Sequence, residues 1–588
     1  MVNGAPTSGA MHPRHACDVI VLGAGVGGMT VAAMCAADGL QVLLLESSPL
    51  LGGTTAISGG MAWMPANTKM SAAGLRDTIA EAELYLASTV PAGNDRLRAA
   101  FVANADHAVT ALEAKTSVRF RPVVKYPDYY PDRPGATMGG RVLEPVPFDG
   151  RELGRHFRCL RPPLAEFTLF GGMMLDRADI PHFRKAGRSL RSAARVARLM
   201  ARHARERLFE RRGTSLYLGN ALAARLLHSL LRPNVEIRRG TRVGELLVDN
   251  GRVTGVVIDS GETREVIRAD RAVVLATGGF SHEPRMRADY LPARAGAYSS
   301  ACASSKGEGI RLALAAGAVM RPQPTNNAFW VPVSVARGKD GRDRIFPHTV
   351  TDRAKPGAIV VDQAARRYVN EAVSYHEFVQ AMFRADEAGR AIPSFMICDS
   401  RFLWKYGLGA VKPFTIAPGG HLRSGYLKRG RTIEELATRL GLPAEALAET
   451  VSSYNQHAAH GADPAFARGS DPYQRHLGDA EHGPNPCVAP IDKAPFYAVA
   501  LHPGDLGTAA GLLTNEHGQV LDASGAWIAN LYACGNDMSS VMNGAYPGPG
   551  ITIGPALTFG VLVAEHIAGA SLNGGHRPQS LRRQGSLR

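Results

Sequence analysis

The chain has 588 residues, which is too long for one hydrophobic core, so more than one domain is expected. Its 45% hydrophobic and 20% charged residues describe an ordinary soluble globular chain. The net charge of +15 is not accompanied by a nucleic-acid-binding motif, and we expect no nucleic-acid partner.

The first sixteen residues lack the apolar stretch of a secretory signal, and no apolar run reaches the length that spans a membrane. A cytoplasmic location is therefore expected. The seven cysteines are an odd number without a CxxC spacing, which argues against a disulfide framework or a zinc site. We expect buried thiols and no metal.

The N-terminal part has the order of elements of a dinucleotide-binding unit. The short apolar run at 17–22 predicts a buried parallel strand, and the glycine-rich stretch 23–28 follows it directly. A helix is expected over 29–38 and a second strand over 41–45. Strand, glycines, helix and strand in this order predict a Rossmann-like fold.

Four residues of this unit are candidate nucleotide contacts. Gly23 permits the tight turn, Gly25 lets the backbone approach a pyrophosphate, and Gly28 permits close packing of helix and strand. Glu46 stands at the end of the second strand, where an acid binds ribose hydroxyls.

Three later segments indicate that the dinucleotide is FAD. The loop 51–60 resembles the glycine and hydroxyl-rich continuation of flavoproteins, and 272–279 and 531–536 resemble their later flavin-binding segments. No histidine stands in the loop at the position where covalent flavoproteins attach the flavin, so noncovalent FAD is expected. The candidate contacts in these segments are Gly52, Gly53, Thr54, Thr55, Ser58, Gly59, Gly60, Ala276, Thr277, Gly278, Gly535 and Asn536.

FAD segments at both ends of the chain predict that a second domain is inserted between them. The expected fold class is α/β with an α+β cap, in which a Rossmann-like FAD-binding domain carries an inserted catalytic domain. The expected boundaries are 14–329 and 503–572 for the two parts of the FAD-binding domain, 330–502 for the catalytic domain and 573–588 for a basic tail.

A basic segment at 184–212 contains eleven Lys or Arg against two acids, and so holds nine of the fifteen net positive charges. At helical spacing, one face carries arginines and roughly the opposite face carries apolar residues. Together with the apolar stretch near 167–175, this pattern predicts peripheral membrane contact through 165–212. The alternative is a solvated cationic face that the alanines pack onto the protein. The two faces are Arg191, Arg195, Arg198, Arg202 and Arg205, and Leu190, Ala193, Ala197, Met200, Ala204 and Leu208.

The sequence YPGPG at 546–550 is the most specific chemical motif. A phenol and a backbone N–H, four residues apart on a backbone stiffened by two prolines, can both donate to one carbonyl oxygen. Tyr546 and Gly550 are therefore candidates for an oxyanion hole.

Three motifs together resemble the 3-ketosteroid Δ1-dehydrogenase family, within the fumarate reductase and succinate dehydrogenase flavoprotein superfamily. They are PDYY at 127–130, which contains Tyr129, RYVNEAVSY at 367–375, which ends in Tyr375, and YPGPG. The resemblance extends from about 18 to 568. The basic insertion at about 151–212 is longer than the family norm and is similar to the membrane-associated cholest-4-en-3-one type.

The resemblance implies an FAD-dependent oxidoreductase of sterol or steroid degradation that introduces a C1–C2 double bond. Tyr546 and the Gly550 N–H would hold the C3 carbonyl, Tyr375 would take the C2 proton with help from Tyr129, and the C1 hydride would go to flavin N5. Among the flavin contacts it implies are Val243 and Ile551.

Several alternatives stay open at the level of sequence. A fumarate-reductase-like enzyme or a 3-ketosteroid Δ4-dehydrogenase shares the flavin motifs. The family's TGDG is replaced by KGEG at 306–309, and Asn536 stands where many superfamily members have Glu. The substrate can be of the cholest-4-en-3-one or the androstane type, and the electron acceptor a quinone or another compound.

Overall fold

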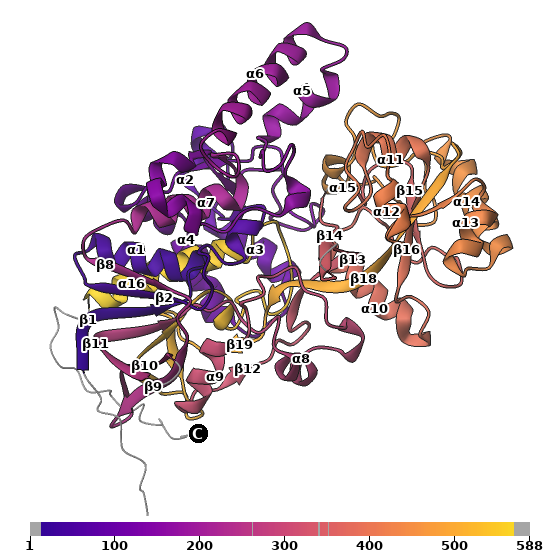
Figure 1. The fold of residues 1–588 in the computed structure, drawn as a ribbon. Coiled ribbons are helices and arrows are strands. Elements are labelled where there is room, and N and C mark those ends of the chain that lie inside the picture. Colours follow the sequence, from indigo (N-terminus) through magenta and orange to yellow (C-terminus); the bar gives the residue numbers. More distant parts are fainter. Residues whose placement is uncertain (1–12, 261–262, 339–340, 351, 570–588) are drawn as a thin grey trace, which may run out of the picture.

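Two large β-sheets, each in its own lobe, organise the chain (Figure 1). The computed structural model describes residues 13–260, 263–338, 341–350 and 352–569. The basic tail expected at 573–588 lies outside the described residues. The mixed α and β composition of both lobes confirms the predicted fold class.

The first sheet has the strand order β20-β21-β10-β11-β1-β2-β8, and β9 pairs with β10. Its central strands β11, β1 and β2 run parallel and are buried on both faces, as their continuous apolar sequences predict. The strands are β1 (Pro13–Leu22), β2 (Val42–Glu46), β8 (Val235–Arg239), β9 (Val243–Asp249), β10 (Arg252–Ser260), β11 (Thr263–Leu275), β20 (Gln519–Leu521) and β21 (Trp527–Ala533).

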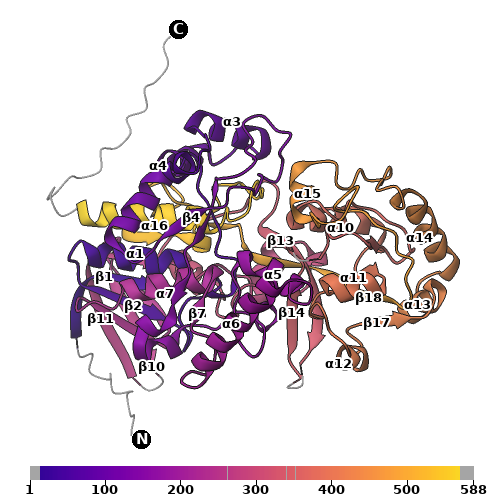
Figure 2. The same cartoon turned by 90° about the horizontal axis from the view of Figure 1, so that it is seen from above.

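Helices from both ends of the chain cover this sheet. Helices α1 (Val26–Ala37) and α16 (Ile553–Gly569) lie side by side (Figure 2), although more than 500 residues separate them. A Cβ on Gly560 of α16 would lie 2.7 Å from Thr30 Cγ2 of α1, so glycine permits this close packing. Helix α4 (Asp95–Lys115) packs against both of them, and α7 (Leu218–Ser229) packs against α1.

The second sheet has the order β14-β13-β18-β16-β15, and β17 pairs with β18. Helix α10 packs against β13, while α13 and α14 cover a smaller hydrophobic core. The elements are β13 (Ala328–Arg337), β14 (Asp343–Pro347), β15 (Ala358–Val361), α10 (Tyr375–Ala385), β16 (Ser394–Cys398), α11 (Ser400–Tyr406), α12 (Gly419–Arg423), β17 (Lys428–Gly430), α13 (Ile433–Leu440), α14 (Ala444–Ala458), α15 (Pro472–Leu477) and β18 (Phe496–Thr508).

A helical hairpin of α5 (Ile180–Lys185) and α6 (Leu190–Arg207) projects from the top of the molecule in Figure 1. It belongs to the predicted basic insertion. No described helix is long and apolar enough to cross a bilayer.

The remaining elements are β3 (Ala62–Trp63), α2 (Thr68–Ala72), α3 (Ile79–Thr89), β4 (Phe120–Pro122), β5 (Val142–Pro145), β6 (Phe148–Asp149), β7 (Ser215–Leu216), α8 (Pro284–Tyr290), α9 (Glu308–Ala315), β12 (Met320–Arg321) and β19 (Gly511–Leu512).

Candidate active site

The turn from β1 to α1 has the shape that a pyrophosphate requires. A Cβ on Gly28 would lie 1.9 Å from the carbonyl oxygen of Gly23, so the helix can approach the strand this closely only with glycine at that position. A Cβ on Gly25 would meet no atom within 4 Å. The N-terminus of α1 is therefore open to a phosphate group at Gly25. The helix begins at Val26, three residues before the predicted start.

Glu46 closes the neighbouring turn at the end of β2. Its carboxylate accepts hydrogen bonds from the backbone N–H groups of Ala24 and Ser48, each at 2.8 Å. Burial raises the pKa of Glu46, and these N–H donors act in the opposite direction. The carboxylate thus holds the loops after β1 and β2 together beside the position expected for a ribose.

A cavity opens between the ends of β1, β2, β9 and β11. Its lining includes the predicted contacts Gly23, Val243 and Thr277, together with Thr241 and Glu308, which the sequence did not single out as cofactor contacts. This cavity lies where the nucleotide end of a dinucleotide is expected.

The hydroxyl groups of the loop 51–60 hold the loop in place. Thr55 Oγ1 accepts the N–H of Val26 at 3.1 Å, and Thr54 Oγ1 accepts the N–H of Cys302 at 2.9 Å. The Ser58 hydroxyl donates to the carbonyl oxygen of Thr55 at 2.8 Å. These contacts bind the loop to the N-terminus of α1 and to a distant segment, in addition to any contact with a cofactor.

The glycines of this loop pack against backbone. A Cβ on Gly53 would lie 3.3 Å from Gly25 Cα, so Gly53 lies directly beside the phosphate turn. Gly52 and Gly60 lie close to the segment around α7, where a Cβ on Gly60 would lie 2.3 Å from the N atom of Gly219. A Cβ on Gly59 would meet nothing within 4 Å.

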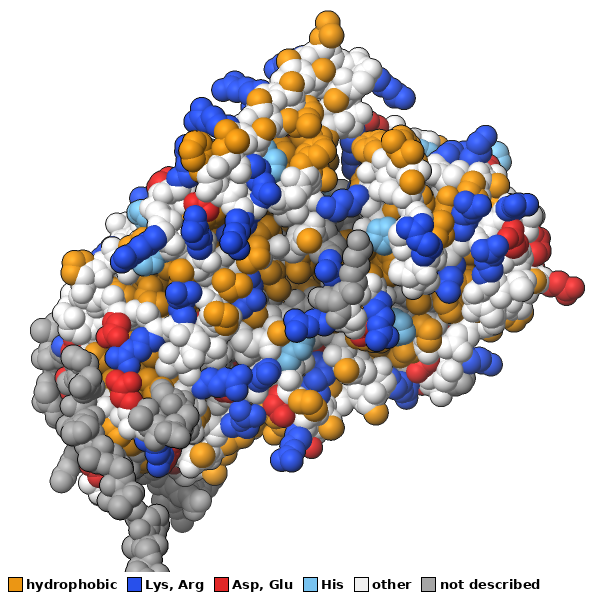
Figure 3. All heavy atoms as spheres, viewed as in Figure 1, with side chains coloured by type: hydrophobic (Ala, Val, Ile, Leu, Met, Phe, Trp, Pro, Cys, Tyr) orange, Lys and Arg blue, Asp and Glu red, His pale blue; other side chains and the backbone are white. Residues whose placement is uncertain are grey.

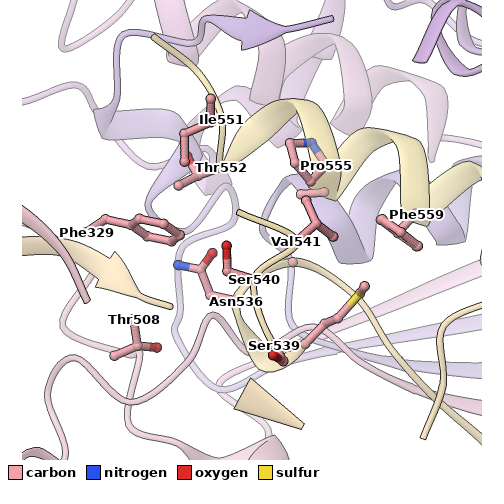
Figure 4. Close-up of a pocket in the computed structure, with 13 residues that line it drawn as sticks. Phe329, Thr508, Asn536, Ser539, Ser540, Val541, Ile551, Thr552, Pro555 and Phe559 are labelled. Atoms are coloured by element: carbon pink, nitrogen blue, oxygen red, sulfur yellow. The ribbon is translucent and has the colours of Figure 1, made fainter. Parts of the chain in front are cut away.

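A second pocket lies at the junction of the two sheets (Figure 4). The predicted contacts Gly535, Asn536 and Ile551 line it. Sequence reasoning missed Phe329 of β13 and Thr552 before α16, whose side chains line the same cavity from other segments. The two cavities and the open turn at Gly25 fit an extended dinucleotide with the flavin at the sheet junction.

Asp537 connects the two flavin segments and was also missed. Its buried carboxylate accepts the N–H and hydroxyl of Thr277 at 2.5 and 2.8 Å and the N–H of Gly279 at 2.8 Å. The end of β11, with Ala276 and Gly278, is thereby held against the 3₁₀ turn Gly535–Asp537. Asp537 directly follows Asn536, a predicted flavin contact, and this position is the sequence signal that could have identified it.

The KGEG sequence keeps the backbone contacts of this region. The N–H of Gly307 donates to the Gly279 carbonyl at 2.9 Å, and the N–H of Gly309 donates to Thr277 Oγ1 at 3.1 Å. The glycines therefore hold α9 against the end of β11.

Hydrogen bonds join two of the tyrosine motifs, which lie more than 400 residues apart. The N–H of Tyr129 donates to the carbonyl of Pro547 at 3.1 Å, and the Tyr85 hydroxyl donates to the same oxygen at 2.5 Å. The buried Asp128 accepts from Trp63 Nε1 at 2.7 Å and from Arg141 Nη1 at 2.8 Å. This network fixes the backbone on both sides of Tyr129.

Gly550 follows in a conformation that requires glycine. Its φ is +93°, and a Cβ would lie 2.4 Å from the carbonyl oxygen of Met61. Its own carbonyl accepts the N–H of Trp63 at 3.1 Å. Within the described part of the chain, the N–H of Gly550 has no recorded acceptor. It is available to a ligand.

Tyr129, Tyr375 and Tyr546 meet at one point. The ring centroids of Tyr375 and Tyr546 are 5.1 Å apart, and those of Tyr129 lie 5.8 Å from Tyr375 and 5.9 Å from Tyr546. All three residues are buried. The structure therefore brings together the three tyrosines that the sequence motifs predicted.

Burial sets the protonation of these phenols. It raises the pKa of Tyr546 to about 12 and the pKa values of Tyr129 and Tyr375 well above the usual value. The Tyr129 hydroxyl, in contrast, lowers the pKa of Tyr375. In addition, Tyr375 is the first residue of α10, where the helix dipole favours an anion.

Further groups of this site were not predicted. Tyr126 directly precedes the PDYY motif; burial raises its pKa to about 12, against the effects of Arg177 and the Tyr129 hydroxyl. The ring of Tyr473 lies 4.6 Å from that of Tyr129. The buried Arg353 has no carboxylate partner among the described residues and no sequence motif that would have identified it.

The chain is similar to known flavoproteins over nearly its whole length. The FAD binding domain family matches residues 18–553. The 4-oxocyclohex-2-ene-1-carboxylate 5-dehydrogenase of Sinomonas cyclohexanicum is 38% identical, with 94% of each chain covered. The 3-oxosteroid 1-dehydrogenase of Mycobacterium tuberculosis is 34% identical, with 94% of this chain and 98% of that protein covered.

One solved structure is similar in both sequence and fold. The 3-ketosteroid Δ1-dehydrogenase of Sterolibacterium denitrificans, in complex with 1,4-androstadiene-3,17-dione, has a TM-score of 0.87 and 36% identity. The match covers 94% of this chain and all of that chain.

Proposed function

The chain belongs to the FAD-dependent 3-ketosteroid Δ1-dehydrogenase family, and we propose that it removes one hydrogen each from C1 and C2 of a 3-ketosteroid. The convergence of the buried Tyr129, Tyr375 and Tyr546 carries this proposal, together with the Gly550 N–H, which belongs to the same motif as Tyr546 and has no acceptor in the described structure. Desaturation beside a ketone requires a carbonyl clamp and a base, and this site contains groups for both.

Tyr546 and the Gly550 N–H form the carbonyl clamp. With a pKa of about 12, the Tyr546 phenol stays protonated at neutral pH and can donate to the C3 oxygen. Two donors stabilise the negative charge that develops on that oxygen when C2 loses its proton, and one such donor contributes about 3 to 4 kcal/mol. FAD, which Gly25, Glu46, Val243, Asn536 and Ile551 would help to hold, supplies the acceptor for the C1 hydride.

Tyr375 takes the C2 proton. Burial opposes the anion of this phenol, but the neighbouring Tyr129 hydroxyl and the N-terminus of α10 favour it. Ser374 caps α10 by accepting the N–H of Glu377 at 3.2 Å, which fixes the backbone at Tyr375.

The 38% identity to a 4-oxocyclohex-2-ene-1-carboxylate dehydrogenase favours one second candidate. A 4-oxocyclohexane carboxylate would present its ketone to the same clamp, while its carboxylate would replace the remaining steroid rings. Both candidates are ring ketones that lose hydrogens near the carbonyl.

Direct turnover separates the candidates. Purified holoenzyme would be given androst-4-ene-3,17-dione, cholest-4-en-3-one and 4-oxocyclohexanecarboxylate with a dye acceptor, and kcat/KM would be compared. We expect a product two hydrogens lighter, with a C1–C2 double bond, from a 3-ketosteroid. Turnover of the carboxylate alone would select the second candidate, and bleaching of the flavin by neither substrate class would contradict both.

We also propose that 14–329 and 503–572 form the FAD-binding domain and that 330–502 form the substrate domain. The first sheet lies within the former and most of the second sheet within the latter. The cavity at their junction, between Phe329 and Asn536, suits a flavin that faces a substrate from the second domain.

We further propose that the α5–α6 hairpin attaches the protein to an anionic membrane. The face of α6 that carries Leu190, Met200 and Leu208 is exposed, and Leu190 is 92% exposed. A different face, with Ser192, Leu199 and His203, packs against the protein. Hydrophobic and basic side chains accordingly gather on the hairpin in Figure 3. This arrangement does not support the alternative in which the alanine-rich face packs inward.

The arginines flank this exposed stripe. Arg195 pairs with Asp179 at 2.8 Å and Arg202 with Glu206 at 3.7 Å, while Arg191, Arg198 and Arg205 have no recorded carboxylate partner in the described residues. Each free surface cation contributes about 1 kcal/mol of attraction to an anionic bilayer. A quinone dissolved in that bilayer would be a suitable electron acceptor.

Substitution tests this attachment better than deletion, because the segment before the hairpin contacts the site. Arg177 lies 5.7 Å over the ring of Tyr126, and Lys412 donates to the Ala165 carbonyl at 3.1 Å. The variant Leu190→Ser/Leu208→Ser/Phe209→Ser should lose sedimentation with anionic liposomes and keep turnover of a soluble androstane.

The matched control is Val248→Ser/Leu314→Ser, at exposed apolar positions away from the hairpin. It should sediment with the liposomes as the parent does, and high salt should release both. Equal sedimentation of the hairpin variant, or none by the parent, would refute membrane attachment.

A further inference from the structure

Arg353 is a buried cation beside the tyrosines of the proposed active site. It is 1% exposed, and its guanidinium donates to the backbone carbonyls of His348 and Glu371 at 2.8 Å and of Val373 at 3.0 Å. The last two carbonyls belong to the segment that leads into Tyr375. Arg353 therefore holds the backbone in front of the proposed base.

The carboxylates around Arg353 are engaged elsewhere. Glu371 binds Arg367 at 2.8 Å and Arg468 at 3.2 Å. Asp352, the sequence neighbour of Arg353, directs Oδ2 to His348 Nδ1 at 2.7 Å. Within the described residues no carboxylate oxygen forms an ion pair with Arg353.

The guanidinium lies 5.0 Å over the ring of Phe378, and two phenols lie within reach of its charge. Those of Tyr473 and Tyr129 interact with the charge of Arg353, as do Asp352 and the like-charged Arg468. The hydroxyls of Tyr129 and Tyr473 are both buried without a hydrogen-bond partner in the described structure. Besides burial, the phenols of Tyr375, Tyr126, Tyr473 and Tyr546 raise the pKa of Tyr129.

We propose that Arg353 is a positioning residue that balances the negative charge of the tyrosine network and acts on Tyr375 through Tyr129. The proposal rests on the proposed function. Before Tyr375 can accept the C2 proton, the network releases one proton to water, which leaves one negative charge on its phenol oxygens. When the C2–H bond breaks, the proton joins Tyr375 and the electron pair moves to the C3 oxygen. The charge of Arg353 stabilises the network in the state that precedes this step.

The pH dependence of C2 exchange tests the proposal independently of electron transfer. The rate at which a bound 3-ketosteroid exchanges its C2 hydrogen with deuterated solvent would be measured against pH for the holoenzyme and its variants. Exchange should rise with pH as the network loses its proton. Arg353→Gln removes the charge but keeps a donor, and should move this rise to higher pH by about one unit or more. Arg353→Lys keeps the charge and should retain most of the original profile.

The control is Arg225→Gln. The Arg225 guanidinium also donates to three backbone carbonyls, those of Ser117, Val146 and Pro147 at 2.7 to 2.9 Å, but it lies outside the tyrosine site, so the profile should not move. A folded Arg353→Gln variant with lower exchange and an unmoved profile would show a structural role alone and overturn the proposal.

A second variant covers the case in which Arg353→Gln does not fold. Tyr473→Phe removes a hydroxyl that makes no hydrogen bond, so folding should be preserved. It should move the profile to lower pH, because the Tyr473 phenol raises the pKa of Tyr129, through which Arg353 acts. An unmoved profile would overturn the proposal. No C2 exchange by the parent enzyme at any pH would instead contradict the proposed function.

Discussion

The Tyr546 hydroxyl is expected to act almost entirely on the rate. Tyr546→Phe removes one donor to the developing oxyanion and should lower kcat by about a hundredfold or more. The flavin should stay bound, because the motif holds Tyr129 and Trp63 through its backbone. Steady-state turnover and the flavin content of the purified variant check this.

Tyr454→Phe is the matched control for this substitution. Its hydroxyl is also buried, has no hydrogen-bond partner in the described structure and belongs to the separate smaller core. It should leave kcat unchanged. Full activity in Tyr546→Phe would remove the clamp from the mechanism.

Substitution of Tyr375 is expected to slow the reaction more than substitution of Tyr129. Tyr375→Phe should abolish both C2 exchange and flavin reduction, because the base is lost. Tyr129→Phe should slow both less, since that hydroxyl favours the Tyr375 anion without accepting the substrate proton. Stopped-flow flavin reduction and deuterium exchange measure the two effects. Unaltered exchange in Tyr375→Phe would assign the base to another group.

At the scale of elements, the junction of β11 with the turn Gly535–Asp537 depends on one carboxylate. Asp537→Ala leaves the N–H groups of Thr277 and Gly279 without their acceptor in a buried place. Because an unsatisfied buried donor costs about 1 to 3 kcal/mol, we expect FAD to bind at least about tenfold more weakly. Titration of the apoprotein with FAD measures this affinity.

Asp522→Ala is the control variant for the effect of Asp537→Ala on FAD affinity. Asp522 caps a surface turn through Ser524 and lies outside both cavities. FAD affinity should remain that of the parent. Equal affinities in the two variants would mean that the flavin segments hold their places without Asp537.

The start of α1 shows why element boundaries were less predictable than element types. The glycine fingerprint indicated strand, turn and helix correctly, but the helix begins at Val26 inside the fingerprint. Its first turn is completed by Thr55, whose hydroxyl accepts the Val26 N–H. A hydrogen-bond acceptor 29 residues away is not visible in the local pattern.

For the whole molecule, a buried charge network stabilises the second lobe. Glu371 is paired with Arg367 and Arg468, and Arg367 also pairs with Asp463 at 2.7 Å. Glu371→Gln leaves these guanidinium groups undercompensated and should lower the free energy of unfolding at neutral pH by about 3 to 5 kcal/mol. Chemical denaturation measures the loss.

The contribution of Glu371 to the free energy of unfolding should decrease in acid. Burial alone would raise the pKa of Glu371, but Arg367 and Arg468 hold it below the usual value. A lowered folded pKa contributes stability above the unfolded pKa of about 4.3, and this contribution is lost as the pH falls through the folded pKa. The difference between parent and Glu371→Gln should therefore shrink in strong acid. A constant difference across this range would contradict the charge assignment.

Local patterns in the sequence determined the flavin fold, the cofactor and the three tyrosine motifs, because turn chemistry, apolar periodicity and short motifs act over a few residues. Only the tertiary structure decided how these parts meet. It joins Tyr129 to Pro547, places the buried Arg353 against the segment that leads into Tyr375, and shows which face of α6 is buried. Each of these depends on contacts between segments far apart in the chain, since burial and charge pairing follow from the packing of the whole molecule.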